Sequence, residues 1–395
     1  MPILAAAITF LAVFGAWQRQ KAQDEASNAP TAPGGLFLAT QAEGTSLTAA
    51  GRTRGLAEPC TAWLLDIGAA ASTPAHVVTA GRCVGATDTV TVLAGDPVAG
   101  ASVDLNDFAR VSTSAQPNAV PVPIEQVVWA SARWIDLAIL QLGTTYGELA
   151  AQGITPIPTV ASPTEGAELL VASVPVAGVP DDQQYLRGSR CTAGAQSDIL
   201  EGGLLWRDAR VTDCGGILEG SAGAPVFNQA GEAVALVATT TIGAPEGADC
   251  TAGRPCEVRD GAVQPLRADA TYALPVAGLA ACFPEGQFTP GADCPLEDPA
   301  TVVRAAAATT TGVPGSAVPV RLEATSPTPR AGVAERSGML GEVDCFDPAG
   351  WSAPSPAEGW ALDLELPGSP GWALACVGSP EQPTPVLVES TATTG

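Results

Sequence analysis

Short strand-like segments separated by turn residues constrain the fold of this chain more than any other feature. Four examples are Ala62-Trp63-Leu64-Leu65, His76-Val77-Val78-Thr79, Thr89-Val90-Thr91-Val92-Leu93 and Val234-Ala235-Leu236-Val237. The 43 glycines and 35 prolines favour many short strands over long helices. Together with the β-branched residues, they predict an all-β fold, either a barrel or a sandwich.

Length and charge limit the size of the fold and its partners. At 395 residues the chain is long enough for two domains plus linkers, and 46% apolar residues can form a core. The net charge of −23 reflects scarce bases, and Lys21 is the one lysine. Nucleic acid and anionic membrane surfaces repel such a chain, so no nucleic-acid partner is expected. The charge is interpreted mainly as a source of solubility, with attraction of a basic partner as the alternative.

The ten cysteines include no Cys-x-x-Cys pair, and the chain has one histidine. A zinc site is therefore not expected, and nothing in the sequence calls for another metal or a cofactor. An even number of widely spaced cysteines predicts five disulfides and an oxidising compartment. The expected location is outside the cell or in the cell envelope or periplasm.

The N-terminal segment predicts a signal peptide or an anchor. Pro2–Trp17 is uncharged and apolar, and as a helix it would reach about 24 Å, short of the ~30 Å hydrocarbon core. Residues 1–21 are therefore interpreted as a signal peptide or N-terminal anchor, and residues 22–34 as a tether. Contact with a membrane is expected only through this segment, if it is not cleaved.

The remaining chain divides by composition. Residues 35–285 contain the strand-like segments, and residues 286–335 are rich in Ala, Thr, Pro and Gly, which predicts a linker, although Val318–Leu322 can form a strand. Residues 336–395 predict a small β module. Two runs with alternating apolar residues there predict a hairpin closed by a Cys345–Cys376 disulfide; their apolar positions are Trp360, Leu362, Leu364 and Leu366, then Trp372, Leu374 and Cys376.

Three segments occur in an order that is typical of one enzyme family. They are Val-Val-Thr-Ala-Gly-Arg-Cys at 77–83, Asp-Leu-Ala-Ile-Leu-Gln-Leu at 136–142 and Gly-Ser-Ala-Gly-Ala-Pro-Val-Phe-Asn at 220–228. Together they resemble the trypsin-like (chymotrypsin-fold) serine proteases, with bacterial members among them, and residues 271–276 resemble the closing strand of that family. The resemblance spans residues 35–285 and implies two packed antiparallel β-barrels with the site between them.

The departures from the family pattern concern its catalytic triad. The resemblance places Arg82 at the histidine position, Ala222 at the nucleophile and Ser221 at the preceding acid, while Asp136 is retained. In the triad, histidine takes a proton from serine and returns it to the leaving group. Arginine does not lose its proton at working pH, and alanine has no nucleophilic atom. The sequence therefore predicts a proteolytically inactive homologue, a pseudoprotease.

Other roles for these residues remain open. Ser221 is an alternative nucleophile, but it needs a base, and the candidates are His76 and Lys21. His76 is interpreted as a packed side chain. The backbone N–H groups of Gly220 and Ala222 are candidates for an oxyanion cradle. Arg82 is predicted to form an ion pair with Asp136 through two parallel hydrogen bonds from its guanidinium.

The resemblance also implies two disulfides, Cys60–Cys83 and Cys191–Cys214. Cys250 and Cys256 are expected to close a surface loop, and Cys282 and Cys294 the end of the domain, although sequence alone does not fix the pairings. The leading prediction is an extracytoplasmic binding or scaffolding protein whose partner is a peptide, a protein or an envelope polymer. The alternatives are an active serine endopeptidase that uses Ser221 and a structural protein of the cell envelope.

Overall fold

The computed structural model describes residues 37–38, 45–108, 119–291, 293–300, 303–308, 318–325, 334–353, 361–366 and 371–390. The predicted signal peptide or anchor (1–21) and tether (22–34) lie outside these residues, as does Lys21. Within the described part of the chain, no helix is both long enough and apolar enough to cross a bilayer.

The first barrel is a closed ring of six antiparallel strands, because β8 pairs with both β7 and β9. In ring order the strands are β8 (Val120–Ser131), β7 (Ser102–Leu105), β2 (Ala50–Arg54), β3 (Thr61–Leu64), β4 (Pro74–Thr79) and β9 (Leu137–Thr145). The short strands β5 (Val92–Leu93) and β6 (Asp96–Pro97) also pair with β8. The predicted strand at 89–93 is therefore limited to its last two residues. Trp63, Trp129 and the apolar run of β9 are fully buried in this barrel.

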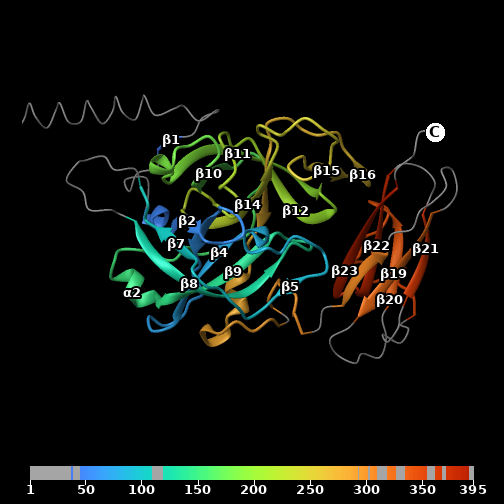
Figure 1. Ribbon diagram of the computed structural model, residues 1–395, viewed down its shortest axis with the longest axis horizontal. Helices are drawn as coiled ribbons and strands as arrows, with labels where there is room; N and C mark the ends of the chain where they lie inside the picture. The colour runs from blue at the N-terminus through green and yellow to red at the C-terminus, as the bar shows by residue number, and fades with distance from the viewer. Residues whose placement is uncertain are drawn as a thin grey trace, which may run out of the picture.

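The second barrel repeats this plan, because β10 pairs with both β13 and β11. In ring order the strands are β10 (Glu168–Ser173), β13 (Pro225–Phe227), β14 (Ala233–Thr240), β17 (Thr271–Pro275), β12 (Leu204–Thr212) and β11 (Arg187–Glu201). Three short strands extend the sheet: β1 (Phe37–Leu38), β15 (Cys256–Arg259) and β16 (Ala262–Val263). The two barrels stack one above the other (Figure 1), and the predicted double-barrel fold is confirmed.

Helices contribute little to the fold and mainly connect strands. The one α-helix among the described residues, α2 (Tyr146–Ala150), begins with a capping box in which the side chains and backbones of Thr145 and Glu148 bond reciprocally. The 3-10 helices are η2 (Thr45–Ala49), η3 (Gly81–Val84), η4 (Asp181–Gln183), η5 (Leu279–Cys282) and η6 (Pro284–Gly286).

All ten cysteines form disulfides, which confirms the expected number. The pairs are Cys60–Cys83, Cys191–Cys214, Cys250–Cys256, Cys282–Cys294 and Cys345–Cys376. Their Cα atoms are 4.6–6.1 Å apart, within the usual range for disulfides.

The C-terminal module, residues 303–390, contains two three-stranded antiparallel sheets that lie beside the barrels (Figure 1). One sheet has the order β18 (Arg304–Ala308), β19 (Val318–Thr325), β21 (Ala361–Leu366). The other has β20 (Ala334–Met339), β22 (Gly371–Ser379), β23 (Gln382–Ser390). The predicted hairpin is wrong: β21 pairs with β19, whereas β22 pairs with β20 and β23. Trp360 lies outside the described residues.

The prediction that residues 286–335 form a linker also differs from the structure. Its second half supplies strands β18 and β19 to the module and includes the alternative strand at 318–322. Its first half belongs to the barrels, because Leu296 packs into the core of the first barrel and the Trp129 indole donates to the Glu297 carbonyl at 3.0 Å. An alanine- and threonine-rich composition does not by itself distinguish a linker from a strand that pairs with distant parts of the chain.

Candidate functional site

Arg82 lies on η3, the short turn that follows β4 at the boundary between the two barrels. The turn packs closely against the end of β8, since a Cβ added to Gly81 would lie 2.3 Å from the Ser131 carbonyl oxygen. The Cys60–Cys83 disulfide then ties the turn to the start of β3. Glycine before position 82 and cysteine after it therefore fix the backbone from which the Arg82 side chain projects.

Asp136 is fully buried, and Arg82 contacts both oxygens of its carboxylate. The Arg82 Nε atom lies 2.9 Å from Oδ2, and the Arg82 backbone N–H donates to Oδ1, also at 2.9 Å. The expected ion pair is present, but the predicted pair of parallel guanidinium hydrogen bonds is not. Nε–H is poorly aligned with Oδ2, and the terminal Nη2 atom donates instead to the carbonyl of Ala238 on β14. Arginine is long enough to reach past the carboxylate into the second barrel.

The electrostatics of this pair are those of buried charges that compensate each other. Burial alone would lower the pKa of Arg82, but the Asp136 carboxylate raises it above its ordinary value, and Glu201 and Glu58 add to that effect. Burial raises the pKa of Asp136, while Arg82 and the backbone N–H groups of residues 81 and 82 oppose the rise. The guanidinium therefore stays charged, and it is the group that makes a buried carboxylate tolerable.

Trp206 is a site residue that the sequence did not reveal. Its ring lies 5.3 Å from the Arg82 guanidinium carbon, within cation–π range, and its indole N–H donates to the Ala132 carbonyl at 2.9 Å. Only 22% of the Arg82 side chain remains exposed. Trp206 lies on β12 in the second barrel, and no motif in its surroundings links it to position 82.

The turn at 220–223 brings the other predicted site residues to this region. Ala222 packs against the cluster of Cys60, Ala80 and Cys83 next to Arg82, and its carbonyl accepts the Thr61 N–H at 3.0 Å. Gly223 needs to be glycine, since its φ is +82° and an added Cβ would lie 2.3 Å from the Thr79 hydroxyl.

In this turn, backbone N–H groups that donate a hydrogen bond to a described residue alternate with N–H groups that do not. The N–H of Ser221 donates to the Leu218 carbonyl, and that of Gly223 donates to the Val237 carbonyl. Within the described chain, no acceptor is found for the N–H groups of Gly220 and Ala222. These are the two groups predicted for an oxyanion cradle, so they remain candidates for binding a carbonyl or carboxylate oxygen.

Ser221 is fully buried, and its hydroxyl bonds to groups that are not bases. Its hydroxyl donates to the Ser173 hydroxyl at 3.2 Å and accepts the Leu218 N–H. His76, the alternative base, is packed against the Phe283 ring at 4.7 Å between centroids. Burial lowers the pKa of His76 to about 4, so the ring is neutral at pH 7. Its interpretation as a packed side chain agrees with this environment.

Residues 60–236 match the family model of the trypsin-like peptidase domain. This part of the chain is a trypsin-like peptidase domain. The match includes positions 82, 136 and 222 and covers slightly less than half of the chain. A search of curated proteins finds no match.

Solved structures similar to the chain include two of Rv3671c from M. tuberculosis. One is a serine-to-alanine mutant in an inactive form, with 14% identity, a TM-score of 0.35 and coverage of 60% of this chain and 85% of that chain. The other is the protease in its active form, with 12% identity, a TM-score of 0.38 and coverage of 63% and 86%. Human heparin binding protein has 15% identity, a TM-score of 0.39 and coverage of 62% and 93%.

Proposed function

We propose that this protein is an extracytoplasmic trypsin-like homologue that binds or scaffolds a partner without cleaving it. The observation that carries the proposal is the Arg82–Asp136 ion pair, 2.9 Å from Nε to Oδ2, at the position where the family places its histidine and aspartate. The guanidinium takes the space of the general base and cannot itself accept a proton.

The missing nucleophile supports the same conclusion. Ala222 has no atom that can attack a carbonyl carbon, and in triad enzymes the loss of serine or histidine alone costs about 10⁶ in rate. What remains is a turn whose Gly220 and Ala222 N–H groups are suited to hold an acceptor oxygen. Such a turn can bind a peptide or a carboxylate without reacting with it.

The rearranged-site alternative requires Ser221 to act as a nucleophile. The hydroxyl is buried and bonded to Ser173, and His76 is packed against Phe283 with a lowered pKa. An attacking serine needs an adjacent base and access to substrate. The geometry around Ser221 therefore favours a structural role, in which it fills the position of the family's acid beside Ala222.

The proposed location follows from the disulfides. Five disulfides in one chain favour an oxidising compartment, hence secretion or the cell envelope or periplasm. The proposed partners are a peptide, a protein or an envelope polymer. Nucleic acid is disfavoured by the net charge of −23.

A fluorophosphonate probe tests the absence of catalysis, because it labels only an activated serine. We expect no labelling of the full chain and no cleavage of peptide substrates. Labelling that disappears in Ser221→Ala would establish the rearranged enzyme instead. Saturable binding of a peptide or an envelope polymer would separate a binding role from a purely structural one.

A further inference from the structure

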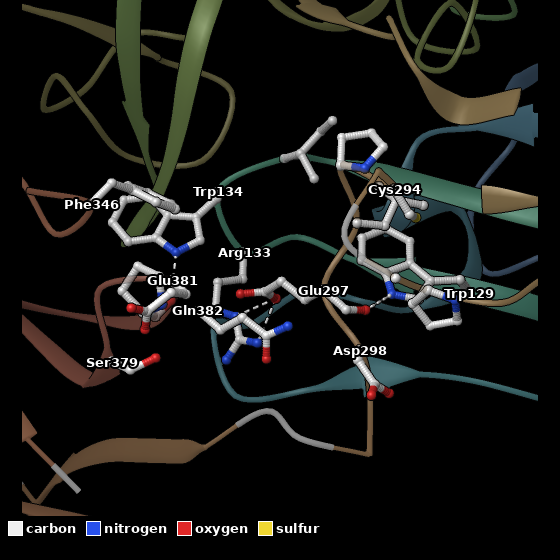
Figure 2. Close-up of a pocket in the computed structure, with 16 residues that line it drawn as sticks. Trp129, Arg133, Trp134, Cys294, Glu297, Asp298, Phe346, Ser379, Glu381 and Gln382 are labelled. Carbon is white, nitrogen blue, oxygen red and sulfur yellow. Dashed lines mark hydrogen bonds and ion pairs between the residues drawn. The ribbon is translucent and has the colours of Figure 1, made fainter. Parts of the chain in front are cut away.

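A cavity of about 750 Å³ lies where the trypsin-like domain meets the C-terminal module (Figure 2). The end of β8 and the following loop form one wall, residues 290–291 and 294–298 a second, and Phe346 with Ser379 and residues 381–383 of the module a third. This volume is typical of pockets that hold a side chain or a small ligand. The cavity is separate from the Arg82–Asp136 pair, which does not line it.

The walls of the cavity are held in place by buried hydrogen bonds. Arg133, which is almost completely buried, donates to the Glu297 carboxylate at 2.5 and 2.9 Å and to the Thr384 hydroxyl at 3.0 Å. The Trp134 indole donates to the Pro383 carbonyl at 2.8 Å. These bonds join the trypsin-like domain to the module, so the cavity is preformed, and a ligand need not order it on binding.

Three aromatic side chains line the cavity: Trp129 on one side, and Trp134 with Phe346 on the other (Figure 2). Phe346 meets Trp134 edge-on, with 5.2 Å between ring centroids. Phe346 is also the one large apolar side chain in the described part of the chain that is exposed, at 37%. An exposed ring at the mouth of a preformed cavity is typical of a contact site.

The charge of the lining selects the sign of the ligand. Glu297, Asp298 and Glu381 supply three carboxylates, and Arg133 supplies the one guanidinium, which leaves the lining with a net charge of −2. The chain as a whole carries −23, so its long-range field draws cations in the same direction. Aromatic faces beside carboxylates are complementary to a cation with a flat, apolar surface.

We propose that this cavity binds an arginine side chain presented by an extended segment of a partner protein. A guanidinium is planar, stacks on indole and phenyl rings and bonds to a carboxylate through two parallel N–H groups, whereas a lysine ammonium does neither. The protein provides an internal precedent, since Arg207, which does not line the cavity, places its guanidinium carbon 4.3 Å from the Phe346 ring centroid. The proposal extends beyond the proposed function, because it holds whether or not the trypsin-like site is catalytic.

The test uses the full chain and a fluorescent peptide of alternating glycine and arginine. Its control is the same peptide with citrulline, which keeps the shape of arginine and removes the charge. We expect saturable binding of the arginine peptide that weakens with added salt, and at least about tenfold weaker binding of the citrulline peptide. A lysine peptide should bind more weakly than the arginine peptide.

Variants assign the binding to the cavity. Phe346→Ala, and separately Asp298→Asn with Glu381→Gln, should each weaken binding about tenfold. Glu246→Gln removes a charge from an exposed carboxylate that does not line the cavity, and it should leave affinity unchanged. Unfolding midpoints of all variants are measured in parallel, so that a loss of folding is not mistaken for a loss of binding.

Two results would overturn the proposal. Equal affinity for the arginine and citrulline peptides, including no binding of either, excludes recognition of a guanidinium. Equal weakening by Glu246→Gln and by the cavity variants would mean that the peptide binds to the general negative field of the protein. A failed peptide test leaves the fluorophosphonate result untouched, so the two proposals fail independently.

Discussion

Replacing Arg82 by alanine tests how this site is stabilised. The substitution leaves Asp136, which is 0% exposed, without its cation, although the backbone N–H groups of residues 81 and 82 still bond to it. Removing one partner of a buried ion pair costs about 3–5 kcal/mol. Because those N–H groups remain and 22% of the Arg82 side chain was exposed, we expect a loss near the lower end, about 3 kcal/mol of the free energy of unfolding.

The pH dependence of this loss identifies the unpaired carboxylate. Burial raises the pKa of Asp136, and without Arg82 the rise is larger. A carboxyl whose folded pKa is raised contributes stability that is present below its unfolded pKa and is lost as pH increases through the folded value. The difference between wild type and Arg82→Ala should therefore be small in acid and grow towards neutral pH.

Urea unfolding followed by circular dichroism measures this difference at each pH. Arg254→Ala is the matched control, because Arg254 also forms an ion pair, at 2.6 Å, but its partner Asp249 is 42% exposed and stays hydrated. The control should cost no more than about 1 kcal/mol. Adding Asp136→Asn to Arg82→Ala should restore much of the lost stability. A loss below about 0.5 kcal/mol for Arg82→Ala, the usual scatter of surface substitutions, would refute this account, as would no recovery with Asp136→Asn.

Three further predictions concern other parts of the molecule. The pKa of His76 falls from 6.5 to about 4 on folding, so the neutral ring contributes fully to the free energy of unfolding above pH 6.5, and about 3 kcal/mol is lost as the pH falls from 6.5 to 4. In urea titrations across pH, His76→Leu should remove this pH dependence, and an unchanged dependence would contradict the burial of a neutral ring. Arg133→Met strands the Glu297 carboxylate at the module junction and should cost about 3 kcal/mol by calorimetry, with recovery when Glu297→Met is added; no recovery would show that the ion pair does not account for the loss. Arg82→His with Ala222→Ser should give at most weak hydrolysis of fluorogenic peptides, since Ser221 still replaces the preceding acid; full activity would show that this acid is dispensable here.

The sequence predicts the barrels better than the module because the barrels have strong local constraints. The segments at 77–83 and 220–228 each contain a glycine whose surroundings leave no room for a side chain: Gly81 lies against the Ser131 carbonyl, and Gly223 lies against the Thr79 hydroxyl. In the module, the alternation in β21 and β22 correctly predicts two strands. It carries no information about partners, and β21 pairs with β19, more than 35 residues earlier in the chain.

The site itself was predicted in part. The ion pair between positions 82 and 136 follows from the triad positions, because a buried carboxylate needs a cation and Arg82 is the residue that faces it. The contacts of the same arginine with Trp206 and with the Ala238 carbonyl were not predictable. Both lie in the second barrel, and no spacing along the chain reports how far a long side chain extends across the boundary between two barrels.

The trypsin-like sequence pattern is present in this chain because most of its residues determine the path of the backbone and take no part in the reaction. The disulfide between Cys60 and Cys83 and the glycines at 81 and 223 position two turns whatever side chains lie between them. Asp136 needs a compensating charge if the fold is to stay stable, since its carboxylate is out of contact with water. A cation at position 82 meets this requirement with no proton transfer, whereas position 222 bears no charge and tolerates alanine. The residues at positions 82 and 222 therefore satisfy the requirements of folding without the groups of a triad, which supports the proposed non-catalytic role.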